Sequence, residues 1–215
     1  MSSKSDDSTP LASKTWQQTK SENTRTTILD AALECFYQLG YANTTTDNIA
    51  KAAGLSRGAM LHHFGSRFEL IKAAVEHLSQ QRLRDYAAAE AAVQDSAEPS
   101  HIDEGLDAYW GELNTPAFIV FHELLVASRT DTELREVLVP ANRRYQKALL
   151  EASRQVFPDL AQSKSFEHAN YLTQFLLEGM AIARLTGTSD IPEELMLNWL
   201  KNALRNDFKD VLNDD

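Results

Sequence analysis

The stretch between Thr44 and Arg67 carries hydroxyl and guanidinium groups at spacings that suit contact with a nucleic acid. Arg57 can donate two hydrogen bonds to O6 and N7 of a guanine, and the small residues Gly58 and Ala59 let a backbone approach base edges. Serine and threonine hydroxyls and the N–H groups at a helix N-terminus can bind phosphates. The candidate DNA-contacting residues are Thr44, Thr45, Thr46, Ser56, Arg57, Gly58, Ala59, Leu61, His62 and Arg67.

The sequence contains no recognisable motif for catalysis or metal binding. We find no nucleophile elbow, no glycine-rich phosphate loop and no HExxH pair, and the six histidines show no metal-ligand spacing with carboxylates. His62 and His63 are neighbours, and adjacent helical positions diverge by about 100°, so they suit a metal poorly. The single cysteine, Cys35, excludes an internal disulfide and a thiolate cluster. We therefore expect no enzyme, no metal and no cofactor.

Two short helices must position the candidate stretch. A threonine of the run 44–46 can cap a helix, Gly54 can take the left-handed conformation that ends it, and Ser56 can cap a further helix that runs to about Phe64. Apolar residues at 49, 55 and 60, with small residues at 50 and 54, suit the core of a helix-turn-helix. A plain connection between two core helices is the alternative. In the helix-turn-helix interpretation, the second helix projects from the surface.

The rest of the chain also shows apolar residues at helical spacing. Besides the two short helices, we expect helices at 24–39, 66–93, 103–113, 116–129, 132–156, 164–186 and 192–213, which makes nine. No segment shows the pattern of a strand, and the 8 glycines and 6 prolines leave few turn signals. The sequence therefore predicts an all-α fold, with an N-terminal three-helix helix-turn-helix domain and a larger helical C-terminal domain.

Charge divides the chain into two parts. Residues 1–80 hold 8 basic and 8 acidic residues, whereas residues 81–215 hold 13 and 23, so the whole net charge of −10 belongs to the second part. We expect a flexible tail at 1–23, a DNA-binding domain at 24–70 that continues into a linker helix at 66–93, and a C-terminal domain at 71–215. Because no apolar run approaches about 20 residues and the N-terminus lacks the apolar centre of a secretory signal, we expect a cytoplasmic protein without membrane contact.

The segment TRTTILDAALECFYQLGYANTTTDNIAKAAGLSRGAMLHHFGSRFELIKAAV resembles the DNA-binding domain of the tetracycline-repressor (TetR) family over about residues 24–75. The similarity lies in the first-helix pattern, in GY…TT…IA…AGLS, in the short helix ending in HHF, and in SR-x-x-L after it. The resemblance implies a homodimeric transcriptional regulator, usually a repressor. It also implies a double-stranded DNA operator and a helical C-terminal domain that binds a small-molecule effector of unknown identity.

One position departs from the pattern of this family. Leu61 stands where the family usually has a tyrosine that contacts the DNA backbone, so a hydroxyl is lost and an apolar contact to a thymine methyl becomes available. By the same resemblance, His62 faces a phosphate and His63 points inward. Operator preference is therefore expected to differ from that of better-known relatives.

Two late helices are expected to form the dimer. The helix at 164–186 is apolar around most of its circumference and the helix at 192–213 has a narrower apolar stripe, so two such pairs can form a four-helix interface. Packing within the protein's own core is the alternative. The candidate interface residues are Leu177, Met180, Met196, Leu200, Leu204 and Phe208.

The effector pocket is expected where aromatic residues of 103–129 can face the helix at 164–186, because small-molecule sites are mostly apolar with a few polar groups. His122 and Glu178 are the informative pair, since an ionisable group on an apolar face needs a partner. The candidate pocket residues are Trp110, Phe118, His122, Tyr171, Phe175 and Glu178. Simple core packing is the alternative for each aromatic residue, and a helical protein-interaction module without DNA binding is the rival function.

Overall fold

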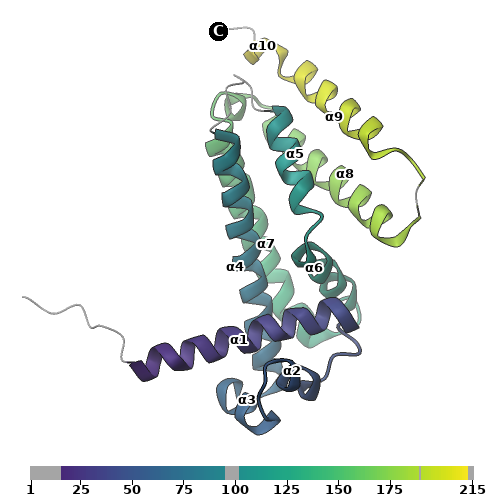
Figure 1. Ribbon diagram of the computed structural model, residues 1–215. Helices are drawn as coiled ribbons and strands as arrows, with labels where there is room; N and C mark the ends of the chain where they lie inside the picture. The colour runs from purple at the N-terminus through teal and green to yellow at the C-terminus, as the bar shows by residue number, and fades with distance from the viewer. Residues whose placement is uncertain (1–15, 95–101, 189, 213–215) are drawn as a thin grey trace, which may run out of the picture.

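The computed structural model describes residues 16–94, 102–188 and 190–212, which form helices joined by short connections (Figure 1). No strand occurs in these ranges, and the predicted all-α fold is confirmed. Ten α-helices and one short 3₁₀ helix are described, where the sequence predicts nine helices. The helices are α1 (Trp16–Leu39), α2 (Thr46–Ala52), α3 (Arg57–Phe64), α4 (Arg67–Gln94), α5 (Ile102–Glu112), α6 (Pro116–Ala127), α7 (Thr132–Val156), η1 (Leu160–Gln162), α8 (Phe166–Thr186), α9 (Glu193–Asp207) and α10 (Lys209–Leu212).

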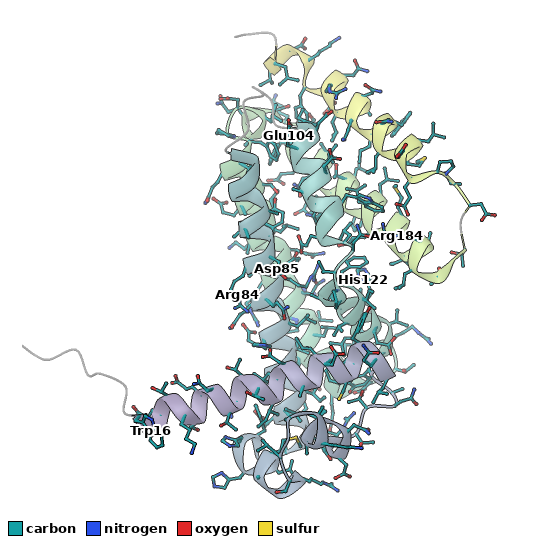
Figure 2. All side chains as sticks on the ribbon, viewed as in Figure 1. Trp16, Arg84, Asp85, Glu104, His122 and Arg184 are labelled. Atoms are coloured by element: carbon teal, nitrogen blue, oxygen red, sulfur yellow. The ribbon has the colours of Figure 1, made fainter. Side chains whose placement is uncertain are left out.

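The first helix begins earlier than predicted. α1 starts at Trp16, so residues 16–23, which the sequence analysis assigns to a flexible tail, are helical. Gln, Lys and Glu in this segment favour a helix, and no glycine or proline interrupts it before Gly40. Figure 2 shows Trp16 at the end of α1 that projects away from the other helices. Residues 1–15 of the predicted tail lie outside the described residues.

The last predicted helix is divided in two. Phe208 separates α9 from α10 with a backbone at φ −101° and ψ 10°, and its ring is buried in the C-terminal core. The connection between the two predicted helices at 132–156 and 164–186 contains the 3₁₀ turn η1. The other helices begin and end within a few residues of their predicted positions.

A first hydrophobic core joins the helix-turn-helix to the body of the protein. It contains the inner faces of α1, α2 and α3 and the first three turns of α4, and it continues into α6 and the first half of α7. Figure 1 shows α4 and α7 side by side along the molecule, with α1 crossing them at the end where α2 and α3 lie. The apolar packing therefore does not stop at the predicted domain boundary between residues 70 and 71.

A second core lies at the other end of the long helices. It is built from α5, the second half of α7, α8 and α9, together with Leu160 of η1 and Phe208. Partly buried Leu83 and Tyr86 of α4 pack against it. α4 and α7 thus contribute to both cores and connect them.

Candidate functional site

The connection between α2 and α3 has the features of a tight helix-turn-helix corner. Gly54 has φ +70°, the left-handed region that glycine adopts without steric cost. The N–H of Leu55 donates to the carbonyl of Ala50 at 2.9 Å, and the half-buried Leu55 side chain packs against the first core. Ser56 then caps α3, with its Oγ accepting from the N–H of Ala59 at 3.2 Å. The predicted Gly54 turn and Ser56 cap are confirmed.

α3 is anchored by one face and exposed on the other. Met60 is fully buried and Phe64 is 6% exposed. Ser56, Arg57, Gly58, Ala59 and His62 are all exposed. This edge can approach a partner without disturbing the core.

Arg57 is positioned on this edge by a weak contact only. Its guanidinium lies 3.6 Å from a carboxylate oxygen of Asp47 on α2, and both side chains are more than half exposed. Exposed ion pairs contribute little to stability because water screens them. The guanidinium can therefore exchange this carboxylate for a guanine edge or a phosphate at small cost.

The three threonines of the predicted phosphate-binding run differ in the structure. Thr44 is only 5% exposed, and its hydroxyl lies 3.1 Å from the carbonyl of Cys35 and 2.8 Å from that of Gly40. The prediction that Thr44 contacts phosphate is therefore wrong, since its hydroxyl is used inside the protein. Thr45 is exposed and caps α2 in a reciprocal capping box with Asn48, and Thr46 is half-buried.

Two residues of α3, the candidate Leu61 and the structural His63, differ from their predicted exposure. Leu61 is predicted on the outer edge, but it is half-buried and packs against the first core, because it lies on the same side of α3 as buried Phe64, three residues on. His63 is half-buried rather than fully internal, and its carbonyl accepts a hydrogen bond from the guanidinium of Arg25 on α1. His62 is exposed, as expected.

Arg67 belongs to a junction that sequence analysis does not reveal. Its guanidinium lies 5.5 Å from the ring centroid of Tyr41, whose hydroxyl donates to Asp131 at 2.7 Å. The N–H of Tyr41 donates to Glu123 of α6 at 3.0 Å. The Leu134 N–H and the Tyr41 hydroxyl lower the pKa of Asp131. Arg67 remains exposed, but its position is set by this junction as well as by any phosphate.

The six predicted pocket residues do not form one cavity wall. Phe175 is 66% exposed and Tyr171 37% exposed, so both lie on the outer face of α8. Trp110 is half-buried and packs under the guanidinium of Arg184, 4.6 Å from its ring centroid. The prediction that Tyr171 and Phe175 face an internal pocket is therefore wrong, because α8 is apolar on faces that do not turn inward, whereas Trp110 of α5 stays half-buried against Arg184.

The other three predicted pocket residues come together in the interior. Figure 2 places His122 among the helices of the C-terminal domain. Its ring lies 4.1 Å from that of buried Phe118, and its Nε2 is 3.9 Å from a carboxylate oxygen of Glu178, which also accepts from the Tyr109 hydroxyl at 3.3 Å. Burial lowers the pKa of His122 and raises that of Glu178. His122 and Glu178, the two ionisable groups that need a partner on an apolar face, therefore lie beside each other.

A buried arginine next to His122 and Glu178 is not among the residues predicted from the sequence. Arg82 of α4 is 3% exposed, and its guanidinium lies between the rings of Phe121 and Tyr145 at 4.1 and 4.0 Å. Glu112 accepts from the Tyr145 hydroxyl at 3.1 Å, and burial raises its pKa to about 7. Arg82 Nε and Glu112 Oε2 are buried and have no hydrogen-bond partner among the described residues. Arg82 follows Leu78 by four positions on the apolar face of α4, and that spacing was the available signal.

The predicted dimer residues divide between the core and the surface. Leu177, Leu200 and Phe208 are at most 5% exposed and belong to the second core, so their assignment to an interface is wrong. Met180, Met196 and Leu204 are half-buried. A different face of α8, α9 and their connection exposes large apolar side chains: Tyr171, Leu172, Phe175, Ile182, Leu185, Ile191, Leu195 and Trp199. We call this set the α8–α9 apolar face.

Two features of other classes of protein are absent from the described residues. No helix there combines the length and the apolar character needed to cross a bilayer. No group of three or more histidine, cysteine or acidic side chains is arranged to hold a metal ion in that part of the chain.

The helix-turn-helix segment matches a known family model. The model of bacterial regulatory proteins of the tetR family matches residues 28–74, which include α2, the Gly54 turn and α3. An uncharacterized HTH-type transcriptional regulator of Mycobacterium tuberculosis is 28% identical over 175 residues, which cover 78% of this chain and 86% of that protein.

Solved structures share the fold over most of the chain. A protein of Mesorhizobium loti assigned to the TetR family of transcriptional regulators has a TM-score of 0.70 at 16% identity, covering 88% of this chain and 97% of its own. The multidrug binding protein EbrR, solved in complex with imidazole, has a TM-score of 0.57 at 22% identity, covering 83% of this chain and 93% of its own. It has also been solved with proflavin.

Proposed function

The chain belongs to the tetR family of DNA-binding transcriptional regulators, and from this premise we propose that it is a homodimeric repressor that a small-molecule effector releases from a palindromic operator. The exposed edge of α3 is the observation that carries this proposal. Arg57, Gly58, Ala59 and His62 are exposed on a helix that Met60 and Phe64 fix to the core. A rigid helix with small residues and one guanidinium at its N-terminal end suits the major groove.

Binding as a dimer sets the geometry of the operator. In a two-fold symmetric complex each α3 enters one major groove, and the half-site centres lie about 34–36 Å apart or a multiple of that distance. The α8–α9 apolar face supports self-association, because many large exposed apolar side chains on two neighbouring helices are typical of an interaction surface. It lies on two helices that can pair with their symmetry copies into four helices.

Release by a small molecule is supported by the likeness of the fold to EbrR, whose structures hold imidazole and proflavin. An effector can reduce operator affinity only by binding the free and DNA-bound conformations with different affinities. α4 begins beside α3 and reaches the second core, so a change at that core can alter the position of α3.

Selection of bound fragments from the host genome, followed by gel shifts at about 50 and about 200 mM salt, tests the proposal. A protein that contacts phosphates binds its selected fragments more weakly as the salt concentration rises, because counterions are released on binding. If no duplex is retained even at the lower concentration, DNA binding is refuted and the rival protein-interaction module becomes the better interpretation.

A further inference from the structure

The C-terminal domain contains a cavity that lies apart from the predicted pocket residues. Its volume is about 90 Å³, and side chains of α4, α5, α7, α8, α9 and η1, together with Phe157 and Phe208, line it. Most of its wall is apolar, with rings from Tyr109, Phe157 and Phe166 and the side chain of Leu106 among them. None of the six pocket residues predicted from the sequence takes part.

One wall of the cavity is polar and internally ordered. Ser153 Oγ donates to the carbonyl of Leu149 at 3.0 Å and accepts from Asn170 Nδ2 at 3.1 Å, and the Tyr86 hydroxyl lies 3.0 Å away. Because the Ser153 hydrogen is already used, Tyr86 is the donor in that contact, and Ser153 has no capacity left. Gln174 Nε2 donates to Asn170 Oδ1 at 2.9 Å.

The amides of Asn170 and Gln174 keep hydrogen-bonding capacity beyond these contacts. Each amide has two N–H donors and an oxygen with two lone pairs, and the bonds just described use only part of this set. Gln174 is 6% exposed, so a bonding partner inside the cavity competes with little water. A hydroxyl or carbonyl group is a suitable partner for such an amide edge.

The lining excludes a charged ligand. None of the side chains that line the cavity in the described part of the chain is Asp, Glu, Lys, Arg or His. The Tyr109 hydroxyl donates to Glu178, and burial holds the pKa of this tyrosine well above its usual value, so it supplies no charge. Burying a charge here without a counter-charge is strongly unfavourable.

The size of the cavity and its edge limit the ligand to about one ring. An engineered cavity of about 150 Å³ in another protein accommodates benzene, and this one is smaller. Its edge can move, however, because Phe157 is half-buried and its ring rests on Gly105. A Cβ at position 105 would lie 2.5 Å from Phe157 Cζ, so only glycine leaves room for the ring in this position.

We propose that this cavity binds a small uncharged molecule with one apolar ring and one hydroxyl or carbonyl group, which the amides of Asn170 and Gln174 hold. The assignment of this molecule as the effector rests on the proposed repressor function; its binding does not. The ligand enters as Phe157 swings away from Gly105. It contacts Tyr86, which lies on the same helix, α4, that begins beside α3.

Calorimetric titration of the full chain with three matched probes tests the ligand class. Phenol carries the ring and the hydroxyl, toluene lacks the hydrogen-bonding group, and benzoate adds a charge. We expect phenol to bind about tenfold more tightly than toluene, the ratio expected for one hydrogen bond, and benzoate not to bind. Equal affinity for benzoate and phenol, or no heat with either phenol or toluene, overturns the proposal.

Three variants distinguish the loss of a polar contact in the cavity from the loss of the fold. Gln174→Leu should weaken phenol binding about tenfold and leave toluene binding unchanged, which also shows that the variant is folded. Gln146→Leu, at an exposed position of α7 outside the cavity, is the matched control and should bind both probes as the wild type does. Ala169→Phe, which fills the cavity from α8, should abolish binding of both probes without lowering the melting temperature. Unchanged phenol binding in Gln174→Leu or in Ala169→Phe overturns the proposal.

A gel shift with and without phenol separates this inference from the proposed function. Probe binding together with release of the selected DNA supports both. Probe binding by a chain that retains no DNA supports the cavity assignment and refutes the repressor function. DNA binding by a chain that takes up neither phenol nor toluene refutes the cavity assignment alone.

Discussion

Replacing Glu112 by glutamine tests the buried polar cluster, because it removes a titration and keeps the shape of the side chain. Burial raises the pKa of Glu112 from 4.5 to about 7, against the opposing effects of Arg82 and the Tyr145 hydroxyl; Asp85 and Glu178 add smaller raising effects. Between these pH values the folded protein holds a proton that the unfolded chain has released. The free energy of unfolding must therefore fall as the pH rises through this interval.

The magnitude follows from the two pKa values. Well above pH 7 Glu112 is ionised in both the folded and the unfolded state. There the difference between its two pKa values corresponds to about 3 kcal/mol of lost stability. Linkage places about 2 kcal/mol of this loss between about pH 5.5 and about pH 8.5. Glutamine does not titrate, so the stability of Glu112→Gln relative to the wild type should rise by about 2 kcal/mol over that range.

Urea unfolding followed by circular dichroism at several pH values measures this difference. The glutamine oxygen can still accept from Tyr145, whereas its NH₂ group replaces the unpartnered Oε2 and adds an offset that does not depend on pH. The prediction concerns the change of the stability difference with pH, and a constant offset cancels in that change. Glu136→Gln, at an exposed position of α7, is the control and should follow the wild-type pH dependence. Parallel curves for Glu112→Gln and the wild type would refute the reasoning.

Four further substitutions test the DNA-binding segment and the dimer. Arg57→Ala should cost about 1–3 kcal/mol of operator binding and relax preference at one base pair, as measured by anisotropy with operator variants; unchanged preference removes Arg57 from the base contacts. Gly58→Ala should stabilise the fold by about 0.5–1 kcal/mol yet weaken DNA binding, because the new Cβ meets no protein atom within 4 Å but would face the bases. Gly54→Ala, at φ +70°, should lose about 1–2 kcal/mol in urea unfolding, and an unchanged midpoint contradicts the left-handed turn. Trp199→Glu should give monomers in sedimentation that keep the helical circular-dichroism spectrum of the wild type, since Trp199 is 62% exposed in the single chain; a persisting dimer moves the interface elsewhere.

The local structure of the helix-turn-helix was predictable because its signals act over a few residues. Ser56 caps α3 through an N–H three residues on, and Gly54 supplies the positive φ through its own backbone. Thr44 shows the limit of such signals. It lies beside the capping Thr45, but the end of α1 buries it against Cys35 and Gly40, and this long-range packing is absent from a local pattern.

The pocket and dimer residues were harder to assign because periodicity gives the apolar character of a helix face and not its partner. α8 is apolar on several faces, so Leu177 and Phe175 look equivalent in sequence, yet Leu177 is fully buried and Phe175 is 66% exposed. The buried polar residues were harder still to predict from the sequence. Arg82 and Glu112 come from α4 and α5 and are brought together when these two helices pack against each other, with Tyr145 of α7 contacting both side chains.

The two ends of α7 connect the cavity to the DNA-binding segment. At one end Ser153 lines the cavity and accepts a hydrogen bond from Tyr86 of α4. At the other end Asp131 caps α7 by accepting from the N–H of Leu134 at 2.9 Å and also accepts from Tyr41, which follows α1 and lies against Arg67. α4 and α7 both enter the two cores, so a ligand that contacts Tyr86 and Ser153 would act on two helices that also pack in the first core. These two helices hold the helix-turn-helix at two points, the start of α4 beside α3 and the Tyr41–Asp131 contact at the start of α7.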